Sequence, residues 1–314
     1  MTQAEARSAA SAGFSVLSPL LGEVNDLKRI SAAGRPGSLA ARGFARAWAA
    51  LIAGETPAFV ARSEAAAAVA AARLGAIDPL ILTRAGLSPG DIRDVLAAAV
   101  NAAAGGLDDR TLGVLRAAVV DLSDYLVRFD EPAGFPSWVG LLAAQPRAGA
   151  TRPGRPRLVL EPTESHAEHC YVTAVYAALV APQFDADPVV PFLAGLAHHF
   201  HNALLPDSGF AGEELLGRHL ATTVVRFTEA AMAELPEPLA VEVAEARRLL
   251  PHAETPEARA FHAADVLDRV LQMAHYARAA AFELRQALDD LDLVHPGPLQ
   301  AFQVDVLSDA GLWP

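Results

Sequence analysis

The sequence predicts an all-α protein, and two observations carry this prediction. Apolar residues recur at helical rather than alternating spacing in almost every segment, and runs of β-branched residues are few. Alanine, leucine, arginine and glutamate, which favour helices, dominate the composition. Of the 314 residues, 52% are hydrophobic, which is enough for the core of one large domain or of two modest ones.

The first half of the chain is expected to contain a series of helices, each ended by a recognisable stop signal. Pro36 and its flanking glycines follow the first helix, Gly54 follows the second, and Ser88 is expected to cap the helix that begins after it. The expected helices span residues 4–18, 38–53, 57–74, 78–85, 90–104 and 108–128.

Residues 145–157 are rich in proline, glycine and arginine and lack apolar periodicity, so we interpret them as a linker. We therefore place a domain boundary near residue 150. Residues 1–150 are expected to form a helical region of unknown role, which completes the core, covers a cleft or forms a homodimer interface; completion of the core is the interpretation we favour. Residues 151–314 are expected to form a second helical domain, with prolines between its helices or at their first positions. Its helices are expected at 164–182, 189–203, 212–234, 238–250, 256–288 and 298–311.

The chain is acidic, and its charge is concentrated in the second half. The formal net charge is −12; residues 1–157 carry 17 basic and 14 acidic groups (+3), whereas residues 158–314 carry 8 basic and 23 acidic groups (−15). An acidic surface repels a polyphosphate backbone and attracts metal cations, so we expect no nucleic-acid partner.

The single cysteine, Cys170, excludes a disulfide framework and a cysteine-only zinc site, and it favours a reducing, cytoplasmic compartment. We expect no export signal, because Glu5 and Pro19 interrupt the first apolar stretch. The apolar stretch over residues 170–184 is shorter than the ~20 residues that a membrane helix needs, so we expect no membrane partner.

Histidines gather on two neighbouring helices of the second half. The first of these helices carries His166 and His169, and the second carries His198, His199 and His201. Residues three apart share one face of a helix, and neutral imidazole is a common metal ligand, so this pattern indicates a metal site between helices. Asp265 is the candidate acidic ligand, because an unpaired carboxylate among its apolar neighbours would be costly and a metal ion would relieve that cost.

Three segments of the second half occur in a familiar order and at familiar separations. They are PTESHAEH (162–169), LAHHFHNALLPD (196–207) and TPEARAFHAADVLDRVLQMAHY (255–276). Together they resemble the HD-domain metal-dependent phosphohydrolases, and most nearly the 5′-deoxynucleotidase-like branch. The third segment is the most specific, and the resemblance covers roughly residues 155–285. It implies an HD-domain helical core within residues 151–314 and a bound divalent metal ion.

The resemblance also implies a set of metal ligands. This set is His169, His198, His199 and Asp265, in which His199 stands where the family has an aspartate. Three neutral donors and one anion suit zinc, iron, cobalt or nickel, and manganese is a further candidate.

The other site residues follow from the same resemblance. Asn202 stands where the family has a glutamate and cannot transfer a proton, so Asp207, with His201, is the candidate proton-transfer group. Lys28, the only lysine of the chain, is far away in the sequence, so we assign phosphate recognition to arginines. The candidates are Arg157, Arg218 and Arg259.

The predicted function is hydrolysis of a small phosphorylated metabolite, such as a nucleoside monophosphate, with a metal ion that polarises a phosphoryl oxygen and acidifies a water molecule. The sequence leaves three interpretations open: a phosphohydrolase that uses Asp207 and His201, a metal enzyme redirected to another substrate, and a noncatalytic ligand-binding or scaffold protein. An iron-dependent oxygenase with His219 as an additional ligand ranks below a mononuclear site, because His199 cannot bridge two metal ions as an aspartate does.

Overall fold

The computed structural model describes residues 3–130, 135–149, 161–280, 283–291 and 293–313. These residues form helices α1 to α15, short 3₁₀ segments and one two-stranded hairpin, so the predicted all-α class is confirmed. The helical segments of the first part are α1 (Gln3–Asn25), η1 (Asp26–Lys28), α2 (Leu39–Ile52), α3 (Pro57–Leu74), α4 (Pro79–Arg84), α5 (Pro89–Ala102), η2 (Ala104–Gly106), α6 (Asp109–Arg128) and α7 (Ser137–Ala144). Those of the second part are α8 (His166–Val180), η3 (Ala181–Phe184), α9 (Val189–Ala197), η4 (Phe200–Ala203), α10 (Gly209–Leu216), η5 (Gly217–His219), α11 (Leu220–Met232), α12 (Glu237–Arg247), α13 (Pro256–Ala280), α14 (Leu284–Leu291) and α15 (Gln300–Asp309).

Short polar side chains begin several helices where the sequence places them. The Thr56 hydroxyl accepts a hydrogen bond from the Phe59 amide at 3.2 Å, and the Ser88 hydroxyl accepts one from the Asp91 amide at 3.2 Å. Such caps satisfy backbone amides that have no partner within the first turn of a helix. This local chemistry explains why the expected bounds of α2 to α6 agree with the observed ones to within two residues.

Helix α1 extends further than the sequence predicts. It continues through Pro19 to Asn25 instead of ending at residue 18. Leu21 and Val24, in the extension, are fully buried in the core. Tertiary packing therefore outweighs the helix-breaking tendency of the proline.

Two short elements of the first part are absent from the sequence prediction. The glycines interpreted as a helix stop belong to an antiparallel hairpin, β1 (Ser31–Ala32) and β2 (Arg35–Ser38), whose turn contains Gly34 at φ +75°. Helix α7 is too short to display a clear helical period, yet it buries Trp138 and Leu142.

Three of the expected helices are interrupted. The segment 189–203 divides into α9 and η4, so His198 and His199 lie between two helical segments. The segment 212–234 divides into α10, η5 and α11, with Gly217 at φ +49° between α10 and α11. A left-handed φ is one that glycine adopts without strain and that an α-helix does not contain. The segment 256–288 divides into α13 and α14.

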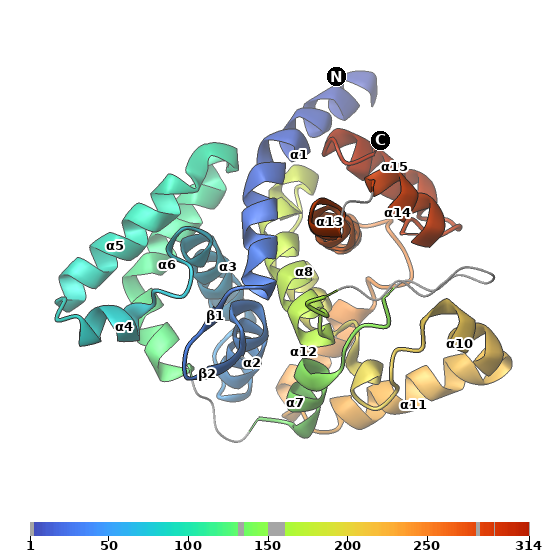
Figure 1. Ribbon diagram of the computed structural model, residues 1–314, viewed down its shortest axis with the longest axis horizontal. Helices are drawn as coiled ribbons and strands as arrows, with labels where there is room; N and C mark the ends of the chain where they lie inside the picture. Colours follow the sequence, from blue (N-terminus) through green and yellow to red (C-terminus); the bar gives the residue numbers. More distant parts are fainter. Residues whose placement is uncertain (1–2, 131–134, 150–160, 281–282, 292, 314) are drawn as a thin grey trace.

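Helix α8 runs through the middle of the molecule (Figure 1). It packs against α2 and α3 of the first part and against α9 and α13 of the second. Every residue of α8 except Ala178 is buried. A helix that is covered on all sides has no face exposed to water. The candidate functional side chains of α8 are therefore held in a fixed environment.

Helices α8 and α9 approach unusually closely at Gly195. A Cβ atom at this position would lie 2.6 Å from the Cα of Ala174, so only glycine fits there. The contact lies three residues before His198 and therefore sets the distance between the histidines of the two helices.

The first part of the chain packs directly against the second. The rings of Trp48 in α2, Trp138 in α7 and Phe200 in η4 meet at centroid distances of 4.5 to 5.4 Å. All three belong to one hydrophobic cluster that contains residues from α1 to α15. The division into two domains near residue 150 stays a prediction.

The first residues of the predicted linker form contacts with the rest of the chain. Pro146 pairs with Ser165, and the amide of Arg147 donates to the Glu164 carbonyl at 2.8 Å, so this stretch is held against the start of α8. Residues 150–157 of the predicted linker lie outside the described residues. Among the described helices, none combines the length and the apolar character needed to cross a membrane.

Candidate metal centre

His169 lies in the first turn of α8, which a capping box fixes. The Ser165 hydroxyl accepts from the Glu168 amide at 3.2 Å, and the Glu168 carboxylate accepts from the Ser165 amide at 2.7 Å. The Ser38 hydroxyl, at the start of α2, donates to the other Glu168 oxygen at 2.5 Å. The first part of the chain therefore helps to hold the turn that carries His169, which is fully buried.

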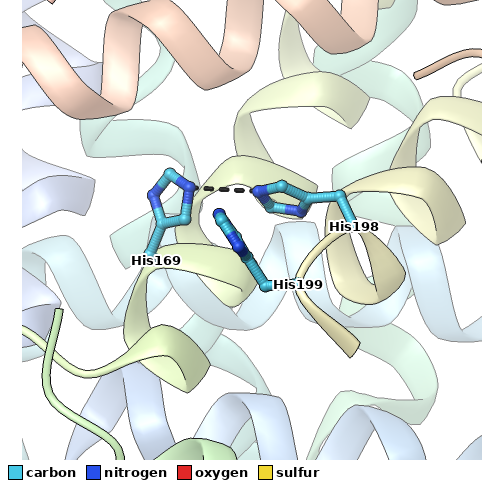
Figure 2. A group of neighbouring side chains, drawn as sticks. All are labelled: His169, His198 and His199. Carbon is cyan, nitrogen blue, oxygen red and sulfur yellow. Dashed lines mark hydrogen bonds between the residues drawn. The ribbon is translucent and has the colours of Figure 1, made fainter. Parts of the chain in front are cut away.

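His198 and His199 follow directly after α9, across from His169. Figure 2 shows the rings of His169 and His198 facing each other, with His199 beside both. The Nε2 atoms of His169 and His198 are 3.0 Å apart. Ligand atoms of the three residues, one from each, all lie within 4.8 Å of one another.

The outer nitrogen, Nδ1, of each imidazole contacts an oxygen that accepts hydrogen bonds. The pairs are His169 with the Asp268 carboxylate at 2.6 Å, His198 with the Gly195 carbonyl at 2.7 Å, and His199 with the side-chain oxygen of Asn202 at 2.7 Å. In a neutral ring the hydrogen therefore lies on Nδ1, and Nε2 keeps a lone pair. Two such lone pairs facing each other at 3.0 Å repel unless a cation lies between them.

Asp265 of α13 adds a carboxylate to this group. Its Oδ1 lies 3.3 Å from Nε2 of His169 and 4.0 Å from Nε2 of His198, while its Oδ2 lies 3.1 Å from the Arg269 guanidinium. Burial would raise the pKa of Asp265, but Arg269 and the neighbouring histidines hold it well below its usual value. The group is therefore an ionised carboxylate with one oxygen directed at the imidazoles.

Two of the three histidines are held in the form that binds metal. Burial lowers the pKa of His198 well below 6.5, with His169 as the next cause. Burial and the neighbouring His198 do the same for His199. Neutral nitrogens with hydrogen-bonded outer atoms, together with one carboxylate, are the chemistry of a divalent metal site. The structure thus brings the three predicted histidines together and places Asp265 beside His169 and His198, and this donor set fits a metal ion.

Lys28 lies next to this group, and the sequence interpretation that set it aside is wrong. Its Nζ lies 2.6 and 2.8 Å from the two carboxylate oxygens of Asp268 and also contacts Glu164. The Asn25 amide donates to Asp268 at 3.1 Å. Because Asp268 also accepts from His169, it fixes the orientation of that ring while η1 holds the carboxylate in place.

A signal for Asp268 is present in the sequence. It follows Asp265 by three residues and therefore shares its face of α13. No local pattern points to Lys28, which is separated from Asp268 by 240 residues. Glu164, His169 and Asp268 form a second group of close donor atoms, but Lys28 bridges its two carboxylates, so this group is an ion-pair cluster.

The predicted proton-transfer residues lie around the histidines at different depths. Asn202 is buried and donates to the Leu205 carbonyl at 3.2 Å, so its amide positions His199. His201 is farther out, with its ring centroid 5.8 Å from that of His199. Burial, followed by the charge of Arg247, lowers the pKa of His201 to about 4.

Asp207 lies beside His166, and His166 lies between Asp207 and the candidate ligand His199. Its carboxylate accepts from the Ala148 amide at 3.0 Å and lies 3.7 Å from Nε2 of His166. The His166 ring is in turn 5.0 Å from the His199 ring. Burial and the charge of Arg147 lower the pKa of His166 to about 4, so this ring is neutral near pH 7.

Besides Arg269, the fold brings Arg147 to this group, and the sequence interpretation placed Arg147 in the linker. Its Nε lies 3.5 Å from the Glu164 carboxylate. Burial opposes its charge, but Glu164, Asp207, Asp265 and Asp268 raise its pKa. Its Nη1 is buried and has no hydrogen-bond partner among the residues that the structure describes.

The arginines predicted to bind substrate are placed differently. Arg157 lies outside the described residues. Arg218 is exposed in η5, and Arg259 packs over the rings of Phe184 and Phe302 at 5.3 and 5.5 Å. No described contact joins Arg218 or Arg259 to the histidines, and their role in substrate binding stays a prediction.

Comparison with known proteins points to the same part of the chain. The HD domain family model matches residues 139–291, a segment that begins within α7, ends with α14 and contains all four predicted ligands. The match supports the assignment of this segment to the HD-domain superfamily. No match was found among curated proteins or among solved structures. Lys28 lies outside the matched segment, so a residue of the first part of the chain contributes to the environment of the candidate metal centre.

Proposed function

We propose that the protein is a metal-dependent hydrolase of a small phosphorylated metabolite, with nucleoside monophosphates as the first substrate class to test. The observation that carries the proposal is the convergence of lone-pair-bearing Nε2 atoms of His169 and His198 on the carboxylate of Asp265. The match to the HD domain supports it, and so does the resemblance of three segments to the 5′-deoxynucleotidase-like branch.

The candidate ligands would hold one divalent ion. They are His169, His198, His199 and Asp265. When bound, such an ion polarises a phosphoryl oxygen and lowers the pKa of a coordinated water. Asp268 and Asn202 would keep two of the imidazoles in the required orientation, since they contact Nδ1 of His169 and of His199.

Proton transfer would fall to Asp207 together with His166. Hydrolysis forms a bond between a water oxygen and phosphorus, breaks the ester P–O bond, and delivers a proton to the departing oxygen. Asp207 lies 3.7 Å from Nε2 of neutral His166, whose Nδ1 contacts the Gln145 carbonyl and whose ring neighbours His199. Both groups would therefore act as acceptors that take a proton from the attacking water and pass it to the departing oxygen. Asn202 cannot serve in this way because a side-chain amide is neither an acid nor a base near neutral pH.

Arg147 would bind the phosphate group of the substrate. The second half of the chain carries a charge of −15, which opposes the approach of an anion. A guanidinium with a free Nη1 among the carboxylates of the site, together with a divalent cation, offsets this charge locally.

The metal assignment is tested by elemental analysis of protein supplied with zinc, manganese, cobalt or iron. The wild type is expected to retain one metal ion per chain, and His198→Ala and Asp265→Ala are expected to lose it. His275→Ala, on the same helix as Asp265 but away from the site, serves as the matched control. A wild type without stoichiometric metal contradicts the site.

The catalytic assignment is tested by phosphate release from a panel of phosphomonoesters that includes nucleoside monophosphates. Arg147→Met is expected to lower kcat/KM by about 10- to 100-fold, the effect of losing one charge-assisted hydrogen bond. The exposed Arg248→Met is the control. Stoichiometric metal without turnover of any ester would instead support a noncatalytic binding protein.

The oxygenase alternative receives no support from the geometry. His219 is exposed in η5, where its ring lies 3.4 Å from the Arg218 side chain. Within the described residues, it is not part of either group of close metal-binding atoms.

A further inference from the structure

The candidate ligands His198 and His199 are neighbours in the sequence, and a continuous helix would direct their side chains about 100° apart. Helix α9 ends at Ala197, and the backbone of His199 leaves the helical conformation, with φ −105° and ψ +23°. The centroids of the two rings lie 4.2 Å apart. The approach of both rings to His169 therefore depends on the chain leaving the helix at this point.

The end of α9 leaves a backbone carbonyl without a helical partner. The last carbonyls of a helix find no donor within it, and within the described residues no backbone amide after α9 donates to the Ala197 carbonyl. Nη1 of Arg247, the last residue of α12, donates to this carbonyl instead. A cation at this position also interacts favourably with the negative end of the helix dipole.

Arg247 also contacts the chain after the two histidines. Its guanidinium carbon lies 5.7 Å from the ring centroid of Phe200, which is fully buried and follows His199 directly. This distance is within the range of a cation–π contact. Its Nη2 lies 3.5 Å from Oγ1 of Thr228 in α11. One side chain of α12 thus holds both the residue before and the residue after the pair of histidines.

An ion pair does not explain why an arginine occupies this place. No carboxylate of the described residues forms an ion pair with Arg247, and burial lowers its pKa. Buried Arg46, in contrast, is paired with Glu64 at 2.7 Å. Because a charge removed from water without an acidic partner destabilises the fold, the contacts with Ala197 and Phe200 are the interactions that account for this arginine.

We propose that Arg247 is a positioning residue, which holds His198 and His199 in the arrangement that binds the metal ion. It supplies no ligand atom and acts through the backbone on both sides of the pair. This inference rests on the proposed metal site, and it adds to that site a residue of α12, a helix that contributes none of the candidate ligands.

The first test needs no metal ion. Hydrogen–deuterium exchange of the metal-free full chain, read by mass spectrometry, follows the peptide 198–206, in which the Asn202 amide donates to the His199 carbonyl at 2.9 Å. Arg247→Met is expected to raise exchange in this peptide by about tenfold, the effect of losing one hydrogen bond. Arg248→Met, at the exposed end of the same helix, is expected to leave it unchanged. Wild-type exchange in Arg247→Met overturns the proposal.

The second test is a titration of the full chain with Co²⁺, in which the visible absorption of the bound ion reports both affinity and coordination. Arg247→Met is expected to bind Co²⁺ about tenfold more weakly than the wild type and with a changed absorption spectrum. Arg248→Met is expected to bind like the wild type. Leu239→Ala removes core packing from the same helix and is expected to lower the melting temperature without changing Co²⁺ affinity, which separates positioning from stability.

The outcomes distinguish the role of Arg247 from the metal site on which it rests. A wild type that binds no Co²⁺ overturns both. Wild-type Co²⁺ affinity in a folded Arg247→Met, or an equal loss of affinity in Leu239→Ala, overturns the role of Arg247 alone. If Arg247→Met does not fold, Arg247→Lys decides the question. This variant keeps the charge but not the planar pair of donors, so Co²⁺ affinity is expected to fall by about threefold, and wild-type affinity together with wild-type exchange overturns the proposal.

Discussion

Substitutions of Asp268 test two roles of this residue: it orients the candidate ligand His169, and it stabilises the fold. In the wild type its carboxylate accepts from Lys28 at 2.6 and 2.8 Å, from Asn25 at 3.1 Å and from His169 at 2.6 Å, with none of its side chain exposed. Asp268→Asn preserves the shape but leaves Lys28 with Glu164 as its remaining anionic partner. Removing one member of a buried ion pair costs about 3–5 kcal/mol of unfolding free energy. The amide oxygen of an asparagine at this position can still accept from His169, so metal affinity is expected to change little in this variant. Replacement by leucine removes the acceptor, and losing the hydrogen-bonded partner of a metal-binding histidine lowers metal affinity by about 10- to 100-fold.

The assay combines urea denaturation, followed by circular dichroism, with metal titration against a chelating dye of known affinity. The double variant Lys28→Met/Asp268→Leu removes both charges, and apolar replacement of a buried pair is often close to neutral, so stability should largely recover. Metal affinity should be low in the double variant, because leucine offers no acceptor for His169. Wild-type metal affinity in the double variant would refute the proposed orientation of His169. A double variant as unstable as Asp268→Asn would refute the explanation from buried charge.

Other consequences of the structure are open to measurement. Gly195→Ala places a methyl group against the backbone of α8 and is expected to lower the unfolding free energy by about 1–3 kcal/mol and to weaken metal binding; unchanged melting and metal content would contradict the close approach. Burial lowers the pKa of His166 and His201 from 6.5 to about 4, so the unfolded chain takes up protons before the folded one. The unfolding free energy of the metal-free protein should therefore be highest above about pH 6.5 and should decrease as the pH falls towards about 4. Urea denaturation at a series of pH values measures this dependence. A flat profile is inconsistent with neutral buried rings. Glu64→Ala leaves Arg46 buried without its partner and should cost about 3–5 kcal/mol while the folded protein keeps its metal; loss of less than about 1 kcal/mol would argue against the buried pair.

Local patterns were sufficient to predict most of the helices, whereas the candidate ligands followed from the family resemblance. The expected helix over residues 189–203 is wrong at His198 and His199, which lie between α9 and η4. The structure brings the three histidines together and places Asp265 of α13 beside two of them. Helix boundaries failed where packing outweighs propensity, as in the extension of α1 beyond Pro19.

The surroundings of the site did not follow from such patterns. Arg147 lies in a stretch without periodicity, which we interpreted as a linker. Only the pairing of the preceding residue, Pro146, with Ser165 brings Arg147 to the carboxylates of the site. The sequence identifies Asp207 as an acidic residue, but only the fold shows that His166 is its neighbour.

The sequence by itself determined the all-α class and the capped helix starts, because these depend on residues within a few turns of one another. Only the tertiary structure decided which charges compensate each other. Lys28 and Asp268 are 240 residues apart, and they meet beside the start of α8, where Lys28 also contacts Glu164 and Asp268 also accepts from His169. A buried charge needs a partner in space and not in sequence, so its partner is determined by packing.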